Sequence, residues 1–369
     1  MGLDSRKRII NTFQGKEIDR FATYDIIHNK DLIEHVCGEK ITPKNAENLA
    51  CKAVGRLLDL VRHFSIPDIS EPKIETDEDG FIRKKDWWTI LTIERPFNDM
   101  NGLTSLVKKD IESIYDCISN KKVCRQAQFP CRLFGEEYEY LDEVKDNFKR
   151  ITDKIEGTVM IAPESCTLYY ALERYGIDWW SYLYCDHPDL AVKHLDALLD
   201  YELLRIDSFA DKSLTQVSFT SDPIGTNNSL MFSPDFIQKV LLPRTKKLIE
   251  RWKSYGYYHI YFADGYKWPV LDEILSWGLI DAVDPFEPLA HMDVARFRSK
   301  YPDTVICQPI DCQNLLYSGT PEEVKETTLK AIKDAGETKV IIGSTSEIHP
   351  RVPVNNAQAM YETARNYKS

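Results

Sequence analysis

Short runs of apolar and β-branched residues recur along the chain, and from about residue 156 they alternate with segments of helical period. This alternation is typical of repeated βαβ units, in which helices connect the strands of a parallel sheet. Seven of the eight strands can be placed in the sequence. The remaining strand must lie between residues 28 and 155, and its position is left open. The pattern predicts the α/β class and a (β/α)8 TIM barrel. The other seven predicted strands are Ala22–Ile27, Thr158–Ala162, Gln216–Thr220, Tyr258–Phe262, Ile280–Val283, Thr304–Cys307 and Lys339–Ile342.

The predicted helices of the second half begin and end at recognisable residues. Ser233 can cap a helix that starts with a proline, and Pro243 should kink this helix before Gly256 ends it. Thr320–Glu323 has the sequence of a capping box, which predicts that a helix begins there. Residues 357–367 form the last predicted helix.

The first part of the chain has a different pattern. Residues 4–14 and 44–62 have helical character, and Ile74–Pro96 contains two strand-like runs separated by Asp77–Gly80. An Asp-Gly turn between two such runs predicts a β-hairpin. We therefore expect a helical and hairpin elaboration within residues 1–110.

Composition and charge narrow the class of protein. The chain of 369 residues has a net charge of -11 and no basic stripe, which argues against a nucleic-acid partner. No run approaches the roughly 18 apolar residues of a membrane span, and the N-terminus has no secretory pattern. The nine cysteines form no Cys-x-x-Cys pair, as expected for reduced thiols. We predict a cytoplasmic protein with one domain over residues 1–369.

Polar residues follow most of the predicted strands. In a parallel barrel, such positions lie at the C-terminal ends of the strands, where active sites are built. Their carboxylates and imidazoles could hold a metal or transfer protons. The predicted catalytic residues are Asp264, Glu287, Asp222 and His349, and the predicted substrate-binding residues are Glu164, Asn227, Tyr261, Tyr266, Asp311 and Glu347.

Each of these assignments has a structural alternative. Asp222 stands in an Asp-Pro-Ile-Gly sequence that could be only a turn, and Asp264 begins a common Asp-Gly turn. Glu287 could be a solvated loop carboxylate, Asp311 could cap the next helix, and His349 could be a surface residue. The aromatic residues around Tyr261 could line a binding pocket or simply pack in the core.

Several segments carry a family resemblance. Thr220–Asp235, Pro309–Asp311, Gly319–Val324 and Pro353–Met360 resemble segments of the uroporphyrinogen decarboxylase superfamily, and Arg6–Arg20 resembles its N-terminus. The resemblance covers nearly the whole chain and implies a (β/α)8 barrel. It leaves the reaction open, because the superfamily includes decarboxylases and cobalamin-dependent methyltransferases.

Departures from the family patterns help to choose between these reactions. The decarboxylase pattern requires an arginine-rich motif after the first strand, and no arginine follows Arg20 there. The thiol-methylating members bind zinc through His-x-Cys, which aligns with Phe262 and Asp264 here, and through a later Cys near Ser346. A thiolate zinc site is therefore absent. The Asp264-Gly265 form resembles members thought to demethylate methoxylated compounds.

The resemblance thus implies transfer of a methyl group from a small methylated substrate, a methoxylated one in the first place, to a corrinoid. Because the chain has no Asp-x-His-x-x-Gly motif, the corrinoid would be supplied by a separate protein. Asp264, Glu287 and His349 are the candidates for holding zinc or for supplying a proton. A homodimer is left open. The alternatives are a decarboxylase of a tetrapyrrole or smaller acid, and a non-catalytic barrel that binds a small molecule.

Overall fold

The barrel contains eight parallel strands. The computed structural model describes residues 2–63, 65–68, 70–127 and 138–367. The strand order is β6-β2-β1-β11-β10-β9-β8-β7, and every neighbouring pair in this order is parallel. The strands are β1 (Ala22–Asp25), β2 (Leu60–Val61), β6 (Val159–Met160), β7 (Val217–Ser221), β8 (Tyr258–Phe262), β9 (Ala282–Asp284), β10 (Val305–Cys307) and β11 (Val340–Ile342).

Backbone hydrogen bonds join the two edge strands of this sheet. The Ala162 amide donates to the Val217 carbonyl at 2.9 Å, and the Ser165 amide donates to the Phe219 carbonyl at 3.1 Å. The segment after β6 therefore lies along β7, and the sheet curves round into a barrel. The predicted (β/α)8 fold is confirmed.

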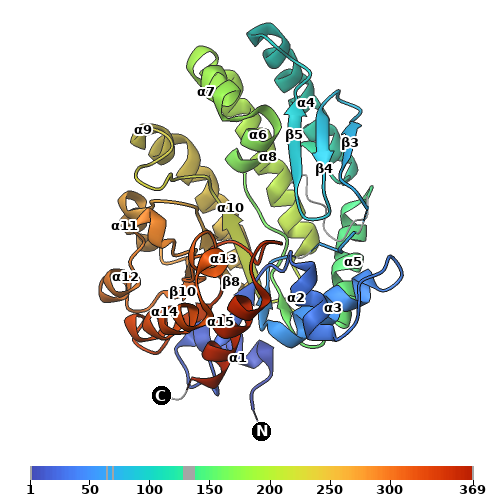
Figure 1. Cartoon of the computed structure of the whole chain (residues 1–369). Coiled ribbons are helices and arrows are strands. Elements are labelled where there is room, and N and C mark those ends of the chain that lie inside the picture. Colours follow the sequence, from blue (N-terminus) through green and yellow to red (C-terminus); the bar gives the residue numbers. More distant parts are fainter. Residues whose placement is uncertain (1, 64, 69, 128–137, 368–369) are drawn as a thin grey trace.

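Helices surround the barrel, and both chain termini lie at the same end of the molecule (Figure 1). No helix in the described ranges is both long and apolar enough to cross a membrane. The helices are α1 (Ser5–Gln14), α2 (Lys30–Cys37), α3 (Ala46–Leu57), α4 (Met100–Asn120), η1 (Arg125–Ala127), α5 (Leu141–Lys154), α6 (Leu168–Tyr175), α7 (Ile177–Asp186), α8 (Pro188–Phe209), α9 (Pro234–Phe236), η3 (Ile237–Leu241), α10 (Leu242–Ser254), α11 (Trp268–Ser276), η4 (Pro288–Ala290), α12 (Val294–Lys300), α13 (Leu315–Ser318), α14 (Pro321–Asp334) and α15 (Val354–Asn366).

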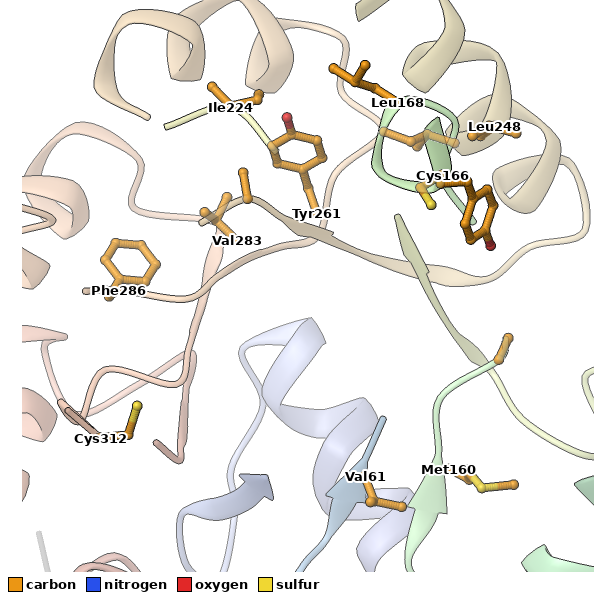
Figure 2. Packing of buried hydrophobic residues seen from close by; sticks show 14 of the residues in the cluster. Val61, Met160, Cys166, Leu168, Ile224, Leu248, Tyr261, Val283, Phe286 and Cys312 are labelled. Atoms are coloured by element: carbon orange, nitrogen blue, oxygen red, sulfur yellow. The ribbon is translucent and has the colours of Figure 1, made fainter. Parts of the chain in front are cut away.

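Alternate residues of several strands enter two different hydrophobic clusters. Leu60, Phe219 and Phe262 belong to a cluster that fills the barrel interior. Their neighbours Val61 and Tyr261 belong to the larger cluster between the strands and the helices. Figure 2 shows this outer layer, in which Tyr261 points from β8 towards the segment that carries Ile224. The period of two thus decides which polar residues can face the barrel axis.

The eighth strand lies within a segment predicted to be helical. Helix α3 ends at Leu57, and β2 occupies Leu60–Val61, so the predicted helix over residues 44–62 is too long. A two-residue strand is too short to show an alternating pattern of its own. Asp59, which is fully buried, fixes the chain between the two elements through contacts with Arg8 and Arg20.

The predicted hairpin is confirmed and has an additional strand. Strands β3 (Lys73–Thr76), β4 (Ile82–Lys85) and β5 (Ile90–Glu94) form an antiparallel sheet beside the barrel helices. Asp77 makes the first turn, because its side chain accepts hydrogen bonds from the amides of Asp79 at 3.1 Å and Phe81 at 2.9 Å.

The predicted helix caps are also found. Ser233 accepts a hydrogen bond from the Phe236 amide at 3.2 Å, and Thr320 forms a capping box with Glu323. Before Pro243, the helix passes through the π-helical segment η3, because proline cannot donate the usual backbone hydrogen bond. Eight cysteines in the described ranges are free, and Cys131 lies outside these ranges.

The buried charge network at Asp59 predicts a large effect on stability. Its carboxylate contacts Arg8 at 2.6 Å and Arg20 at 2.7 Å. Asp59→Asn would leave Arg20 without its carboxylate partner and Arg8 with Asp19 alone, so we expect the free energy of unfolding to fall by about 3 kcal/mol or more. Urea denaturation measures this change. Asp303→Asn is the control, because that side chain is 98% exposed and should have little effect. Equal stability of the two variants would contradict the role given to Asp59.

Candidate active site

An arginine lies at the centre of the barrel, at the C-terminal ends of the strands. Arg62 directly follows β2, and its guanidinium carbon lies 5.0 Å from the ring centroid of Phe219 and 4.9 Å from that of Phe262. These rings belong to β7 and β8, so the Arg62 side chain reaches across the barrel. Its Nε atom is 3.9 Å from a carboxylate oxygen of Glu164. Burial opposes the charge, but Glu164 and other acidic groups outweigh it and raise the pKa of Arg62.

Two aspartates at the ends of adjacent strands face this arginine. Asp284 ends β9, is fully buried, and has no well-aligned hydrogen-bond donor at either carboxylate oxygen, although the Tyr24 phenol is near enough to lower its pKa. Burial nevertheless raises the pKa of Asp284 to about 8, against the opposing charges of Arg62 and Lys267. Asp264 follows β8 and is partly exposed. Burial and then the charge of Glu287 raise its pKa to about 6.

Lys267 adds a second cation to this group. It is fully buried, and its ammonium donates to the Pro285 carbonyl at 2.7 Å. Burial lowers the pKa of Lys267 to about 8, while the charges of Glu287, Asp264 and Asp284 act in the opposite direction. Buried charges remain stable only when opposite charges or hydrogen bonds compensate for lost water. The acids and bases of this cluster therefore control one another's protonation.

Two glycines allow the loops after β7 and β8 to approach closely. A Cβ atom at Gly225 would lie 2.5 Å from the Tyr266 amide nitrogen, and one at Gly265 would lie 2.5 Å from the Gly225 carbonyl carbon. Gly265 also has a φ of +76°. Its amide donates to the Glu287 carboxylate, which fixes that acid beside Asp264. The Asp264-Gly265 sequence is thus a turn that also positions two acids.

Glu164 is held from two sides. Its carboxylate accepts a hydrogen bond from Ser221 on β7. Its backbone carbonyl accepts from the Tyr170 phenol at 3.3 Å and from Arg205. Arg205 is in turn bound to Glu202, which is fully buried. These contacts determine where the Glu164 carboxylate sits relative to Arg62.

A second group of side chains lies at the ends of β1 and β2. His28 is bound through Nδ1 to Glu347 at 2.9 Å and through Nε2 to Ser65 at 3.2 Å. The rings of Trp87 and Trp88 lie 5.9 and 6.2 Å from the His28 ring, and His63 lies 6.0 Å away. The tryptophans come from the turn between β4 and β5, so the small sheet covers this side of the barrel mouth. His63 connects the two groups, because Arg62 and His28 are both among the charges that lower its pKa after burial.

Two predicted site residues face away from the barrel mouth. Asp222 accepts hydrogen bonds from Thr245 on α10 at 2.7 Å and from Tyr261 at 3.2 Å. The side chains of Asp222, Thr245 and Tyr261 therefore meet between β7, β8 and α10, in the layer outside the barrel. The expectation that Asp222 faces the mouth is therefore corrected, and Tyr261 packs in the core, which was its structural alternative. Ser221, one residue earlier, occupies the inward position instead.

The other predicted residues lie outside the charged cluster. Asp311 accepts hydrogen bonds from the amides that follow it, including that of Gln313 at 2.9 Å, so it has the capping role that was its structural alternative. His349 accepts from the Arg351 amide at 3.2 Å. Asn227 is exposed, and Tyr266 donates its amide to the Thr226 carbonyl at 2.7 Å. Roles for these residues in substrate binding remain predictions.

The donor set for zinc is not assembled. Within the described residues, no group of three or more His, Cys, Asp or Glu side chains could hold a metal ion. Asp264 and Glu287 are neighbours, but the third predicted ligand, His349, is directed to the Arg351 amide. A protein zinc site normally needs three or four such ligands, so these residues do not fit the metal.

Four central residues are not among those predicted from the sequence: Tyr24, Arg62, Lys267 and Asp284. Arg62 falls within the helix predicted over residues 44–62, and Asp284 lies one residue beyond the strand predicted over Ile280–Val283. Strand alternation could have found three of them. Ala22, Leu60 and Ala282 face the interior, so Tyr24, Arg62 and Asp284, two positions later, must face it too.

The fold and the ionisable cluster define a (β/α)8 barrel of the kind that carries its active site at the C-terminal ends of the strands. The chain belongs to the uroporphyrinogen decarboxylase (URO-D) family, whose model matches residues 137–367. Searched against curated proteins, the sequence has no significant match.

Two solved structures are similar to the chain. A methyltransferase from Methanosarcina mazei shares 13% identity with a TM-score of 0.66, covering 98% of each chain. A B12-independent methionine synthase from Shewanella sp. W3-18-1 shares 12% identity with a TM-score of 0.40, covering 93% of this chain and 97% of the other. At these identities, the first likeness supports the fold, and the second carries no further argument.

The raised pKa of Asp284 predicts a pH-dependent stability. Its folded-state pKa of about 8 lies above the ordinary value of 3.8, so folding takes up a proton between these pH values. The free energy of unfolding of the wild type should therefore fall as pH rises through this window. Asp284→Asn removes this ionisation. The free energy of unfolding of the variant should therefore rise relative to that of the wild type from pH 4 to pH 8. Denaturation curves across this range provide the measurement, and a constant difference would contradict the assignment.

Proposed function

We propose that the protein transfers a methyl group from a small methylated compound and that Asp264 protonates the leaving atom. The observation that carries this proposal is the position of Asp264. It follows β8 at the barrel mouth, is partly exposed, and has a pKa of about 6. A proton donor is most effective when its pKa is close to the working pH.

The neighbouring residues have defined roles in this step. The bond between the methyl carbon and the substrate oxygen breaks, the methyl group moves to the acceptor, and the bonding electrons remain on oxygen. Oxygen then takes the proton of Asp264, giving an alcohol or a phenol. Glu287 keeps the pKa of Asp264 high enough for this donation, while Lys267 and Arg62 limit the shift. Solvent returns the proton, because Asp264 is partly exposed.

The proposed methyl acceptor is a reduced corrinoid carried by a separate protein. A reduced corrinoid supplies a strong nucleophile for methyl groups, and this chain has no cobalamin-binding motif of its own. The family membership supports the choice of reaction class, because the superfamily includes corrinoid-dependent methyltransferases. The similar protein from Methanosarcina mazei is a methyltransferase, which agrees with this choice.

Decarboxylation of a tetrapyrrole receives less support. Such a substrate carries many carboxylates, and each would need a cationic partner. The central cluster has two cations, Arg62 and Lys267, among the acids Glu164, Asp264, Asp284 and Glu287. This balance disfavours a polyanion.

Asp264→Asn should lower kcat about 100- to 10,000-fold, the usual contribution of a general acid. Free reduced cobalamin can serve as the acceptor and a panel of methoxylated aromatic compounds as donors, with formation of the phenol followed by chromatography. The wild-type kcat should fall as pH rises above about 6, because Asp264 then loses its proton. Asp235→Asn is the matched control, because Asp235 is an exposed aspartate in α9, and it should retain most of the activity. An Asp264→Asn variant with wild-type kcat would rule out the proposed donor, and release of CO2 in place of a phenol would favour decarboxylation.

Removal of metal ions should leave the methyl-transfer rate unchanged. The acid cluster supplies the proton, and the described residues offer no three-ligand metal site. The measurement compares kcat before and after dialysis against a chelator, with elemental analysis of both samples. A loss of activity that added zinc restores would show that a metal takes part and would replace the acid-only proposal.

A further inference from the structure

The Arg62 guanidinium has unused hydrogen-bonding capacity. No hydrogen bond from Arg62 is found within the described part of the chain, and its Nε atom is buried without an acceptor. An arginine has five N–H donors in a planar fork, and buried donors without acceptors are costly. The protein thus maintains a fixed cation whose donors are free to bind an incoming group.

The nearest acid, Glu164, does not use these donors. The Glu164 carboxylate stays 3.9 Å from Nε, beyond hydrogen-bonding distance. It is already bound to Ser221, and the backbone of Glu164 is held by Tyr170 and Arg205. Glu164 therefore keeps Arg62 charged without occupying its hydrogen-bonding edge.

The other neighbours fix the guanidinium without satisfying it. Phe219 and Phe262 lie 5.0 and 4.9 Å from its carbon and hold it by cation–π contacts. The carboxylate oxygens of Asp284 form no well-aligned hydrogen bond, and the Lys267 ammonium is bound to the Pro285 carbonyl. The orientation of Arg62 is thus set before a ligand arrives, which reduces the entropic cost of binding.

We propose that Arg62 binds a carboxylate of the substrate, so that the preferred substrates are small methylated monocarboxylic acids. A carboxylate matches the arginine fork through two parallel hydrogen bonds. The charge of Asp264 acts on Arg62, so an acid held at Arg62 lies close to the proposed proton donor. Further carboxylates would meet Glu164, Asp264 and Glu287, which restricts the substrate to one. This inference rests on the proposed function for the methyl group, but binding alone tests it.

The test uses a charged ligand and its neutral counterpart. Calorimetry at pH 7.5 measures binding of 4-methoxybenzoate and of 4-methoxybenzamide to the full chain, without any methyl acceptor. The wild type should bind the acid about 10- to 100-fold more tightly than the amide, the range expected for hydrogen bonds to a charged group. In Arg62→Gln this preference should disappear. Arg62→Lys, which keeps the charge but lacks the fork, should retain only part of it.

Arg351→Gln is the matched control, because Arg351 is an exposed arginine in the loop after β11. It should retain the full preference for the acid, which excludes a general effect of net charge. Thermal melting confirms that each variant is folded. The ligand pair also tests the wild type directly, so the result does not depend on the stability of one variant.

Three results would overturn the inference: equal binding of acid and amide, no binding of either at 10 mM, or an unchanged preference in Arg62→Gln. The outcome is separable from that of the proposed reaction. Arg62-dependent binding of the acid without phenol formation would retain the carboxylate site and reject methyl transfer. Turnover of neutral methoxylated compounds with no dependence on Arg62 would retain methyl transfer and reject the carboxylate site.

Discussion

The arrangement of the site depends on burying one guanidinium among carboxylates at the centre of the barrel. Arg62 lies over the rings of Phe219 and Phe262, where water is largely excluded and charges interact strongly. Removing a charge from water is unfavourable unless opposite charges lie nearby. The parallel strands supply those charges, because their C-terminal ends converge on one ring of positions. Asp264, Asp284 and Glu164 each enter this ring from a different strand.

The same arrangement raises the pKa values of buried acids in the cluster. Carboxyl groups that shared their charge fully with cations would have low pKa values and could not donate protons near neutral pH. Here burial dominates at Asp264 and Asp284, and their pKa values rise to about 6 and about 8. Burial has the opposite effect on Lys267 and lowers its pKa to about 8. At the other end of the barrel, Asp59 is saturated by Arg8 and Arg20, and its pKa is lowered. The charges at one end of the barrel thus lower the pKa of a buried carboxyl group, whereas burial at the other end raises the pKa values of two.

How much can be predicted from the sequence depends on the length of each element. Strand β8 is predicted with its observed bounds because its five residues show a clear apolar pattern, whereas β2 has only two residues and is absorbed into a predicted helix. Asp264 and Glu287 are predicted because each follows a recognisable strand. The same reasoning includes Asp222, but the neighbouring Ser221 holds the inward position, so Asp222 faces α10. Proximity to a strand end is therefore insufficient, and strand parity is the missing criterion.

Contacts between segments that are distant in the sequence cannot be predicted from local sequence patterns. The approach of Gly225 to Gly265 and the pairing of His28 with Glu347 each join different loops, and neither follows from spacing along the chain. The same limit applies to the predicted metal ligands. Asp264 and Glu287 are near each other as expected, but a third ligand has to come from another loop, and His349 is bound to its own turn. Two carboxyl groups without that third ligand repel each other, and this repulsion contributes to the raised pKa of Asp264. The described cluster therefore places a carboxyl group of raised pKa at the position where the sequence suggests a metal.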